Sequence, residues 1–159
     1  MNKQPALKKK SIDEVASLLI PLADRVLLVP TVTVAEMVPY TEPRRDPEAP
    51  DWYMGIVNWR EIQVPILCFE VLNGGSMPEY NNKCRLAIMN NAGVDDSLPF
   101  LGLATQGIPR LSRVKPDEIH ELTEIATKRF ELMVVSLAGE TVAIPDIVAL
   151  EQAYLDYRN

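Results

Sequence analysis

The sequence has little of the chemistry from which catalytic and metal sites are built. It contains one histidine, His120, and two cysteines, Cys68 and Cys84, whose spacing matches no common metal-binding pattern. Only seven glycines are present, and they form neither a Gly-x-Gly-x-x-Gly stretch nor a phosphate-binding loop. We therefore expect no metal, no cofactor and no enzymatic activity.

One catalytic alternative stays open at this point. Cys68 or Cys84 could pair with His120 as the nucleophile and base of a small hydrolase. Both cysteines lie in apolar, strand-like segments, where burial raises the pKa of a thiol and lowers its reactivity. The sequence favours two reduced structural thiols, as is usual in the cytoplasm.

Long hydrophobic runs are also missing. The apolar stretch at 15–22 follows acidic residues and is too short to cross a bilayer, and no other segment comes near the roughly 18 apolar residues that a membrane helix needs. We expect a cytoplasmic protein with no membrane insertion.

The charge balance excludes another class of partner. The net charge is −6, and four of the sixteen basic residues fall within the first ten positions. The remaining body is strongly acidic and would repel a phosphate backbone, which argues against nucleic-acid binding. Residues 1–11 are expected to form a flexible basic tail, and residues 12–159 a single domain with its own core.

What the sequence does contain is a series of short apolar runs separated by its thirteen prolines and by polar turns. This pattern is typical of an all-β sandwich or barrel. The strands are expected at 18–21, 26–29, 31–38, 56–59, 62–69, 85–89, 99–105, 129–137 and 141–144. Apolar residues recur at helical spacing after Pro145, which predicts an amphipathic helix at the C-terminus.

The segment 49–70 is the most specific in layout. Asp51 could cap one helical turn at 52–54, which Gly55 would end. Arg60 lies between two strand-like stretches and needs a carboxylate partner if it is buried, because an unpaired buried charge costs several kcal/mol. Glu36, at the end of the preceding strand, is the best candidate. The alternative is that Arg60 is an ordinary exposed strand residue.

Two further features of this segment bear on docking. Gly55 carries no side chain, so a partner could approach it closely, and Gly55→Asp is expected to weaken binding with the fold intact. The aromatic residues Trp52, Tyr53 and Trp59 are expected in or near the core, with anchoring of a partner as the alternative.

These motifs resemble a known family. Pro50, Gly55, Val57-Asn58-x-Arg60 and Val64-Pro65-Ile66 are similar to the signature of CheW-like domains, the receptor–kinase coupling adaptors of bacterial chemotaxis. The stretches 34–38 and 102–108 resemble the flanking motifs of the family, in the right order. The similarity runs from about Leu18 to Leu155, which is nearly the whole chain.

The resemblance implies a fold and two partners. The fold would be two intertwined five-stranded SH3-like β-barrels with short helical turns and a C-terminal helix, without catalysis. The partners would be the cytoplasmic tip of a methyl-accepting chemoreceptor and the regulatory domain of a CheA-type histidine kinase. Carried over by motif, the receptor-binding groove between the barrels would contain Glu36, Val38, Gly55, Asn58, Arg60, Gly102, Ile108 and Leu111, with Glu36 supporting Arg60 from beneath.

Departures from the family pattern point to a subgroup. Glu61 and Cys68-Phe69 stand where the family usually has glycine and Asp-Leu, and Gln106 replaces a later aspartate. The chain is more similar here to the auxiliary CheW-like proteins of pilus-type chemosensory systems, of the ChpC kind, which would connect it to type IV pili and twitching motility.

A β-barrel that senses a small molecule is the alternative function, and it would need a sizeable apolar cavity.

Overall fold

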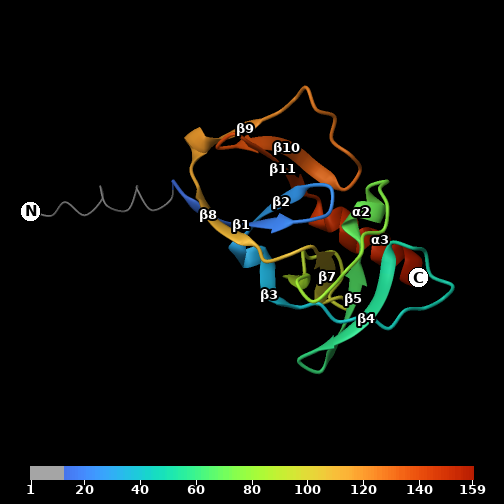
Figure 1. Cartoon of the computed structure of the whole chain (residues 1–159). Coiled ribbons are helices and arrows are strands. Elements are labelled where there is room, and N and C mark those ends of the chain that lie inside the picture. The colour runs from blue at the N-terminus through green and yellow to red at the C-terminus, as the bar shows by residue number, and fades with distance from the viewer. Residues whose placement is uncertain (1–12) are drawn as a thin grey trace, which may run out of the picture.

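The computed structural model describes residues 13–159, and the predicted basic tail lies outside the described residues. The described chain is mostly β-structure arranged as two sheets, with one long helix near the C-terminus (Figure 1). This confirms the predicted fold class.

The first sheet, which we call the terminal barrel, draws its strands from both ends of the chain. Its order is β8 (Arg110–Val114), β1 (Val15–Pro21), β2 (Val26–Pro30), β11 (Glu140–Pro145), β10 (Glu131–Leu137) and β9 (Ile119–Glu121). All neighbours are antiparallel except β2 and β11, which meet in parallel at Leu27 and Ala143. The short β9 makes this sheet six-stranded, one strand more than the prediction.

The second sheet, which we call the central barrel, uses the continuous middle of the chain. Its order is β3 (Val34–Pro39), β6 (Arg85–Asn90), β7 (Phe100–Thr105), β5 (Ile62–Leu67) and β4 (Tyr53–Trp59). The chain therefore begins in the terminal barrel, builds the central barrel and then returns. The two barrels are intertwined because one takes its strands from both ends of the chain and the other from the middle.

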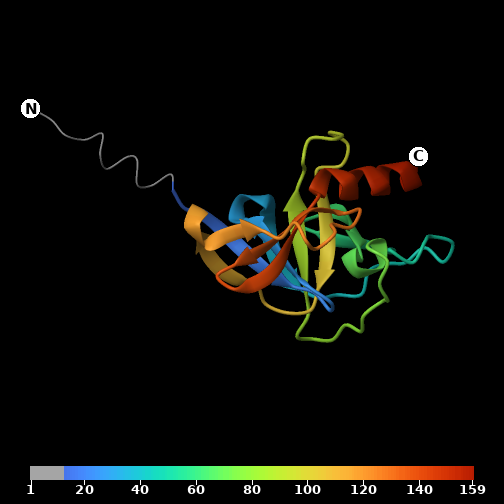
Figure 2. The ribbon, with the colours of Figure 1, turned by 90° about the horizontal axis from the view of Figure 1, so that it is seen from above.

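Short helical elements mark the connections. Two 3₁₀ turns, η1 (Thr31–Thr33) and η2 (Pro116–Glu118), precede β3 and β9, and α2 (Phe69–Leu72) follows β5. The long helix α3 (Ile147–Arg158) begins at Asp146, whose Oδ1 accepts a hydrogen bond from the backbone N–H of Ala149 at 3.0 Å. Figure 2 shows α3 leaving the terminal barrel and lying along one side of the central barrel.

Three apolar cores hold these layers together. One fills the terminal barrel around Leu28 and Val135, and a second fills the central barrel around Val64 and Ile88. The largest lies between the two barrels and α3, and joins buried side chains from both. In β6, Leu86 and Ile88 point into the central barrel while Ala87 and Met89 point into this shared core. Burial on both faces explains why such strands are unbroken apolar runs rather than alternating ones.

Several local predictions are wrong. The expected helical turn at 52–54 is absent: Tyr53 and Met54 begin β4, paired with β5. The expected strand at 31–38 starts with η1, and Phe69 starts α2 rather than ending a strand. The strands β8 and β9 were not expected, because exposed charged residues mask their alternation.

Candidate protein-docking site

The β4–β5 hairpin tip carries the most informative residue of the predicted site. Trp59 pairs with Ile62, which leaves Arg60 and Glu61 as a two-residue turn with φ values of 50° and 63°. Positive φ at both central residues is the pattern of a type I′ hairpin turn. Arg60 therefore lies between two strands, as predicted, but in the turn that joins them, so the alternative of an ordinary strand residue is wrong.

The predicted ion pair is present. Nη2 of Arg60 donates a hydrogen bond to Oε1 of Glu36 on β3 at 3.1 Å. The Arg60 and Glu36 side chains are 69% and 40% exposed, so the pair contributes at most about 1 kcal/mol to stability. Its importance is positional, because β3 and β4 are the two outer strands of the central sheet and the pair closes the barrel between them.

Trp59 reinforces this closure. Its indole Nε1–H donates to the same Oε1 of Glu36 at 2.9 Å, and its ring packs edge-on against Phe100 with the centroids 4.8 Å apart. The Arg60 guanidinium lies over the Trp59 ring, 5.0 Å from its centroid. Trp59 is half-buried, so it belongs to the edge of the core and supports Arg60 from below.

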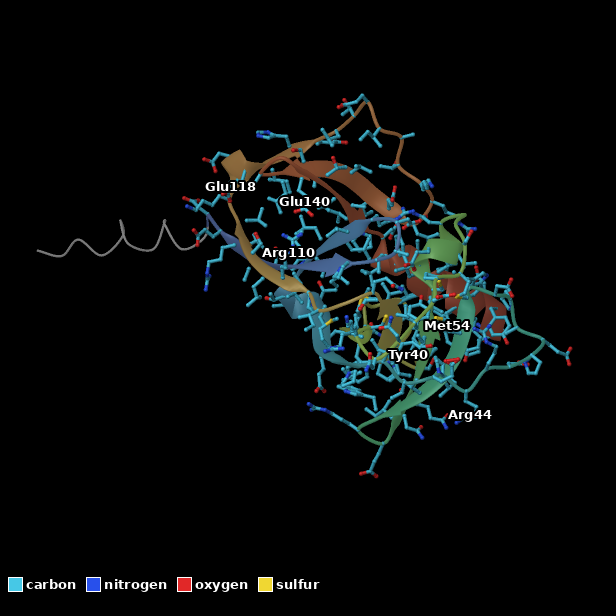
Figure 3. The ribbon with its side chains drawn as sticks, viewed as in Figure 1. Tyr40, Arg44, Met54, Arg110, Glu118 and Glu140 are labelled. Atoms are coloured by element: carbon cyan, nitrogen blue, oxygen red, sulfur yellow. The ribbon has the colours of Figure 1, made fainter. Side chains whose placement is uncertain are left out.

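Gly55 lies in β4, not at the end of a helix, and it is buried. Its φ is 124°, and a Cβ there would lie 2.3 Å from the backbone oxygen of Arg44. Arg44 and Ile56 exchange two backbone hydrogen bonds at this crossing, of 2.8 and 3.2 Å (Figure 3 labels Arg44). Any side chain at Gly55 must displace this segment. The expectation that Gly55→Asp leaves the fold intact is therefore wrong, since the glycine serves a close backbone crossing.

Two other predicted residues also face inward. Gly102 is buried in β7, where a Cβ would lie 2.4 Å from Cδ1 of Ile66. Val38 on β3 is half-buried and packs against the core of the central barrel. These two residues shape the barrel wall and present little surface to a partner.

The remaining residues form two exposed groups. The first is the hairpin-tip cluster on the central barrel, formed by the exposed Asn58 and Arg60 with the half-buried Glu36. The second lies where the chain crosses between the barrels, and sequence reasoning found only two of its three members. We call it the apolar row; it consists of Val32, Ile108 and Leu111, whose exposed fractions are 79%, 68% and 77%.

The three residues of the apolar row lie on segments that border β1. Leu111 on β8 stands opposite Leu18, which packs against the shared core. Val32 belongs to η1, which begins directly after Pro30, the residue of β2 that pairs with Ser17 of β1. Ile108 lies two residues after Gln106, whose backbone N–H donates a hydrogen bond to the backbone oxygen of Pro21 at 2.9 Å. No feature of the Thr-Val-Thr sequence around Val32 distinguishes it from a strand, so this residue was missed.

Strand β8 is fixed beside this row by its own ion pair. Nη2 of Arg110 donates to Oε2 of Glu140 on β11 at 2.8 Å, and Figure 3 shows the two residues in the terminal barrel. Leu111 therefore lies on an edge strand that pairs with β1 and makes one further, exposed contact with β11.

The chemistry needed for the catalytic alternative is not assembled. His120 is exposed on β9 of the terminal barrel, whereas Cys68 and Cys84 are buried in the central barrel. Burial raises the pKa of the Cys68 thiol to about 11, which leaves almost no thiolate at neutral pH. Among residues 13–159, no group of three or more His, Cys, Asp or Glu side chains is placed to hold a metal ion.

The cavity needed for the small-molecule alternative is filled. Leu19, Leu28, Val135 and Val142 occupy the interior of the terminal barrel, and an apolar depression of ≈ 390 Å³ lies beside Val15 and Ile119. Within residues 13–159, no helix is both long and apolar enough to cross a lipid bilayer.

Comparison with known proteins agrees with this architecture. The crystal structure of the scaffolding protein TtCheW from Thermoanaerobacter tengcongensis matches with a TM-score of 0.70 at 17% sequence identity, over 83% of this chain and 88% of that one. A search of curated proteins gave no match. The CheW-like domain family matches residues 16–153. Because this match spans nearly all of the described chain, the protein belongs to the CheW-like domain family, the adaptor proteins of bacterial chemotaxis.

Proposed function

We propose that this protein is a non-catalytic cytoplasmic adaptor that couples the cytoplasmic tip of a chemoreceptor to the regulatory domain of a CheA-type histidine kinase. The observation that carries the proposal is the apolar row along the barrel junction, in a protein whose buried thiols lack reactive partners. These are the three most exposed large apolar side chains among residues 13–159, and exposed apolar surface often marks a protein-docking site.

The geometry of the row suits a helical partner. Val32, Ile108 and Leu111 are fixed on two inter-barrel connections and on β8, so they form a pre-organised surface. A receptor helix could lay an apolar face along this row. The hairpin-tip cluster would add a charged contact at Arg60, with Glu36 holding its guanidinium in place.

The shared core supports one adaptor unit in which both barrels act together. It combines Leu27 and Val29 of the terminal barrel with Leu101 and Leu103 of the central one. We therefore treat residues 12–159 as a single functional domain. Two bodies locked in this way can hold a receptor and a kinase at a fixed separation.

A pilus-type pathway with twitching motility as its output is the finer part of the proposal. It rests on the resemblance of Asn58-Trp59-Arg60 and Cys68-Phe69-Glu70 to the ChpC kind of protein. In the structure Glu70 is buried, and its Oε2 accepts a hydrogen bond from the N–H of Ala23 at 2.8 Å. The Cys68-Phe69-Glu70 part of this resemblance is therefore buried, and Glu70 joins the two barrels.

The decisive experiment compares two exposed leucines. Leu111→Asp is expected to weaken binding of the full chain to a receptor signalling fragment about tenfold or more, because it puts a charge into an apolar contact. Leu132→Asp is the matched control, since Leu132 is also exposed on a strand but lies on β10. Affinity is measured by calorimetry or pull-down, and circular dichroism checks folding.

Three results would contradict the proposal. One is equal loss of binding by both variants, and another is unchanged receptor binding by a folded Leu111→Asp protein. The third is failure of the wild-type chain to bind any receptor or CheA-type kinase of its source organism, with which co-purification would be expected.

A further inference from the structure

The tip of the β4–β5 hairpin combines a conformation that favours glycine with a charged residue. Glu61 has a φ of 63° and follows Arg60, which also has a positive φ. Residues other than Gly, Asn and Asp seldom adopt this region, and the second central position of a type I′ turn usually holds glycine. The backbone at Glu61 is therefore strained.

The same chain offers an internal comparison. The β10–β11 hairpin closes between Leu137 and Glu140 with a two-residue turn, in which Ala138 has a φ of 49° and Gly139 a φ of 88°. That turn has glycine at the position where the β4–β5 turn has Glu61. The geometry of the turn alone thus gives no reason for a glutamate.

The folded chain gives no other reason for it. Glu61 is exposed, and within residues 13–159 its carboxylate takes part in no hydrogen bond or ion pair. The neighbouring Arg60 is already engaged by Glu36 and lies over Trp59. The side chain of Glu61 is consequently a free negative charge on a hairpin whose base is held rigidly.

We infer that Glu61 is a specificity-determining residue of the docking surface, and that its carboxylate binds a lysine or arginine side chain on the receptor tip. Residues that keep a strained backbone cluster where a protein binds, because the surrounding structure offsets the strain. Charge complementarity at the rim of an interface mainly selects partners. The inference rests on the proposed function, since it deepens the description of the same surface.

The test separates strain from charge with three variants of the full chain. Glu61→Gly removes both, and we expect a melting temperature about 2–4 °C higher together with receptor binding about two- to fivefold weaker. Glu61→Gln removes only the charge, so the same loss of binding is expected with little change in melting temperature. Gly139→Glu, the matched control, adds strain at the other hairpin and should lower the melting temperature while binding stays unchanged.

Salt provides a second readout. The difference between wild type and Glu61→Gln should shrink to nothing at about 1 M salt, where charges are screened within roughly 3 Å. A loss that persists there would overturn the charge assignment. Unchanged receptor binding by Glu61→Gln, or a loss confined to the kinase regulatory domain, would overturn the inference while the adaptor function stands. If the wild-type chain binds no receptor, the proposed function fails and the inference fails with it.

Discussion

At the scale of single residues, glycines and charges have different roles from those that their sequence context suggests. Gly55 was a candidate contact because it lacks a side chain. In the structure, the missing side chain instead leaves room for the backbone of the 41–51 loop to cross closely over β4. Arg60 was expected to pair with Glu36 if its guanidinium were buried. The pair exists, but Arg60 is exposed and Glu36 is half-buried, and the pair links the two outer strands of the central sheet.

A pair of glycine substitutions tests this assignment. Gly55→Ala is expected to lower the free energy of unfolding by about 2 kcal/mol or more, because a Cβ at this site meets the backbone of Arg44 and the φ is unfavourable. Gly139→Ala should cost only about 1 kcal/mol, since its φ is also positive but no atom lies within 4 Å of the new Cβ. Urea unfolding of both variants measures the difference. Equal costs would show that the contact with Arg44 is unimportant.

At the scale of elements, α3 is attached to the rest of the molecule partly through a buried acid. Glu151 is fully buried, and its Oε2 accepts a hydrogen bond from the N–H of Ala92 in the β6–β7 loop at 2.7 Å. Its Oε1 has no partner among the described residues. Burial raises the pKa of Glu151 above its usual value, so folding favours the neutral form more than the unfolded chain does.

This arrangement predicts a pH dependence. A raised pKa stabilises the fold below the ordinary value of 4.5, and this stabilisation is lost as the pH rises through the folded-state pKa. Glu151→Gln keeps an acceptor for Ala92 but cannot ionise. We expect this variant to be more stable than wild type at pH 7 by about 1 kcal/mol, with the difference shrinking towards pH 4.

The matched control lies on the same helix. Asp156→Asn removes one negative charge from α3 at an exposed position, where the carboxylate accepts a hydrogen bond from Gln152 at 2.9 Å. It should leave the difference between pH 4 and pH 7 nearly unchanged. Thermal unfolding across this pH range measures both variants, and parallel curves for Glu151→Gln and wild type would refute the assignment.

At the scale of the whole molecule, polar contacts supplement the shared core. Arg25, in the β1–β2 turn, is bound by Asp24 and by Glu131 of β10. Asn73, just after α2, donates to Oε2 of the same Glu131 at 3.2 Å and accepts from the N–H of Phe130. These contacts fasten the segment after the central barrel strand β5 to the terminal barrel.

Because the largest core belongs to both barrels, they should unfold together. Both tryptophans, Trp52 and Trp59, lie in or next to the central barrel, so their fluorescence reports on that barrel and on the shared core against which Trp52 packs. Far-UV circular dichroism reports on both. We expect the two signals to give the same midpoint in a urea titration, as a two-state transition requires. A separate earlier or later transition in one signal would mean that the barrels are independent units.

The sequence by itself determined the features that depend on neighbours along the chain. Apolar runs of the right length located most strands, such as 85–89 and 141–144, and helical spacing located α3. The charge rule that pairs a lone arginine with a nearby acid identified Glu36 and Arg60. Motif order then indicated the family.

Only the tertiary structure decided the features that depend on segments far apart in the sequence. It buried Gly55 and Gly102 against Arg44 and Ile66, and it exposed Val32 on a 3₁₀ turn. It also gave Arg60 and Glu61 positive φ values in the two-residue turn between β4 and β5. The physical reason is that local spacing shows which faces are apolar, whereas close packing between distant segments decides which of those faces stay exposed to a partner.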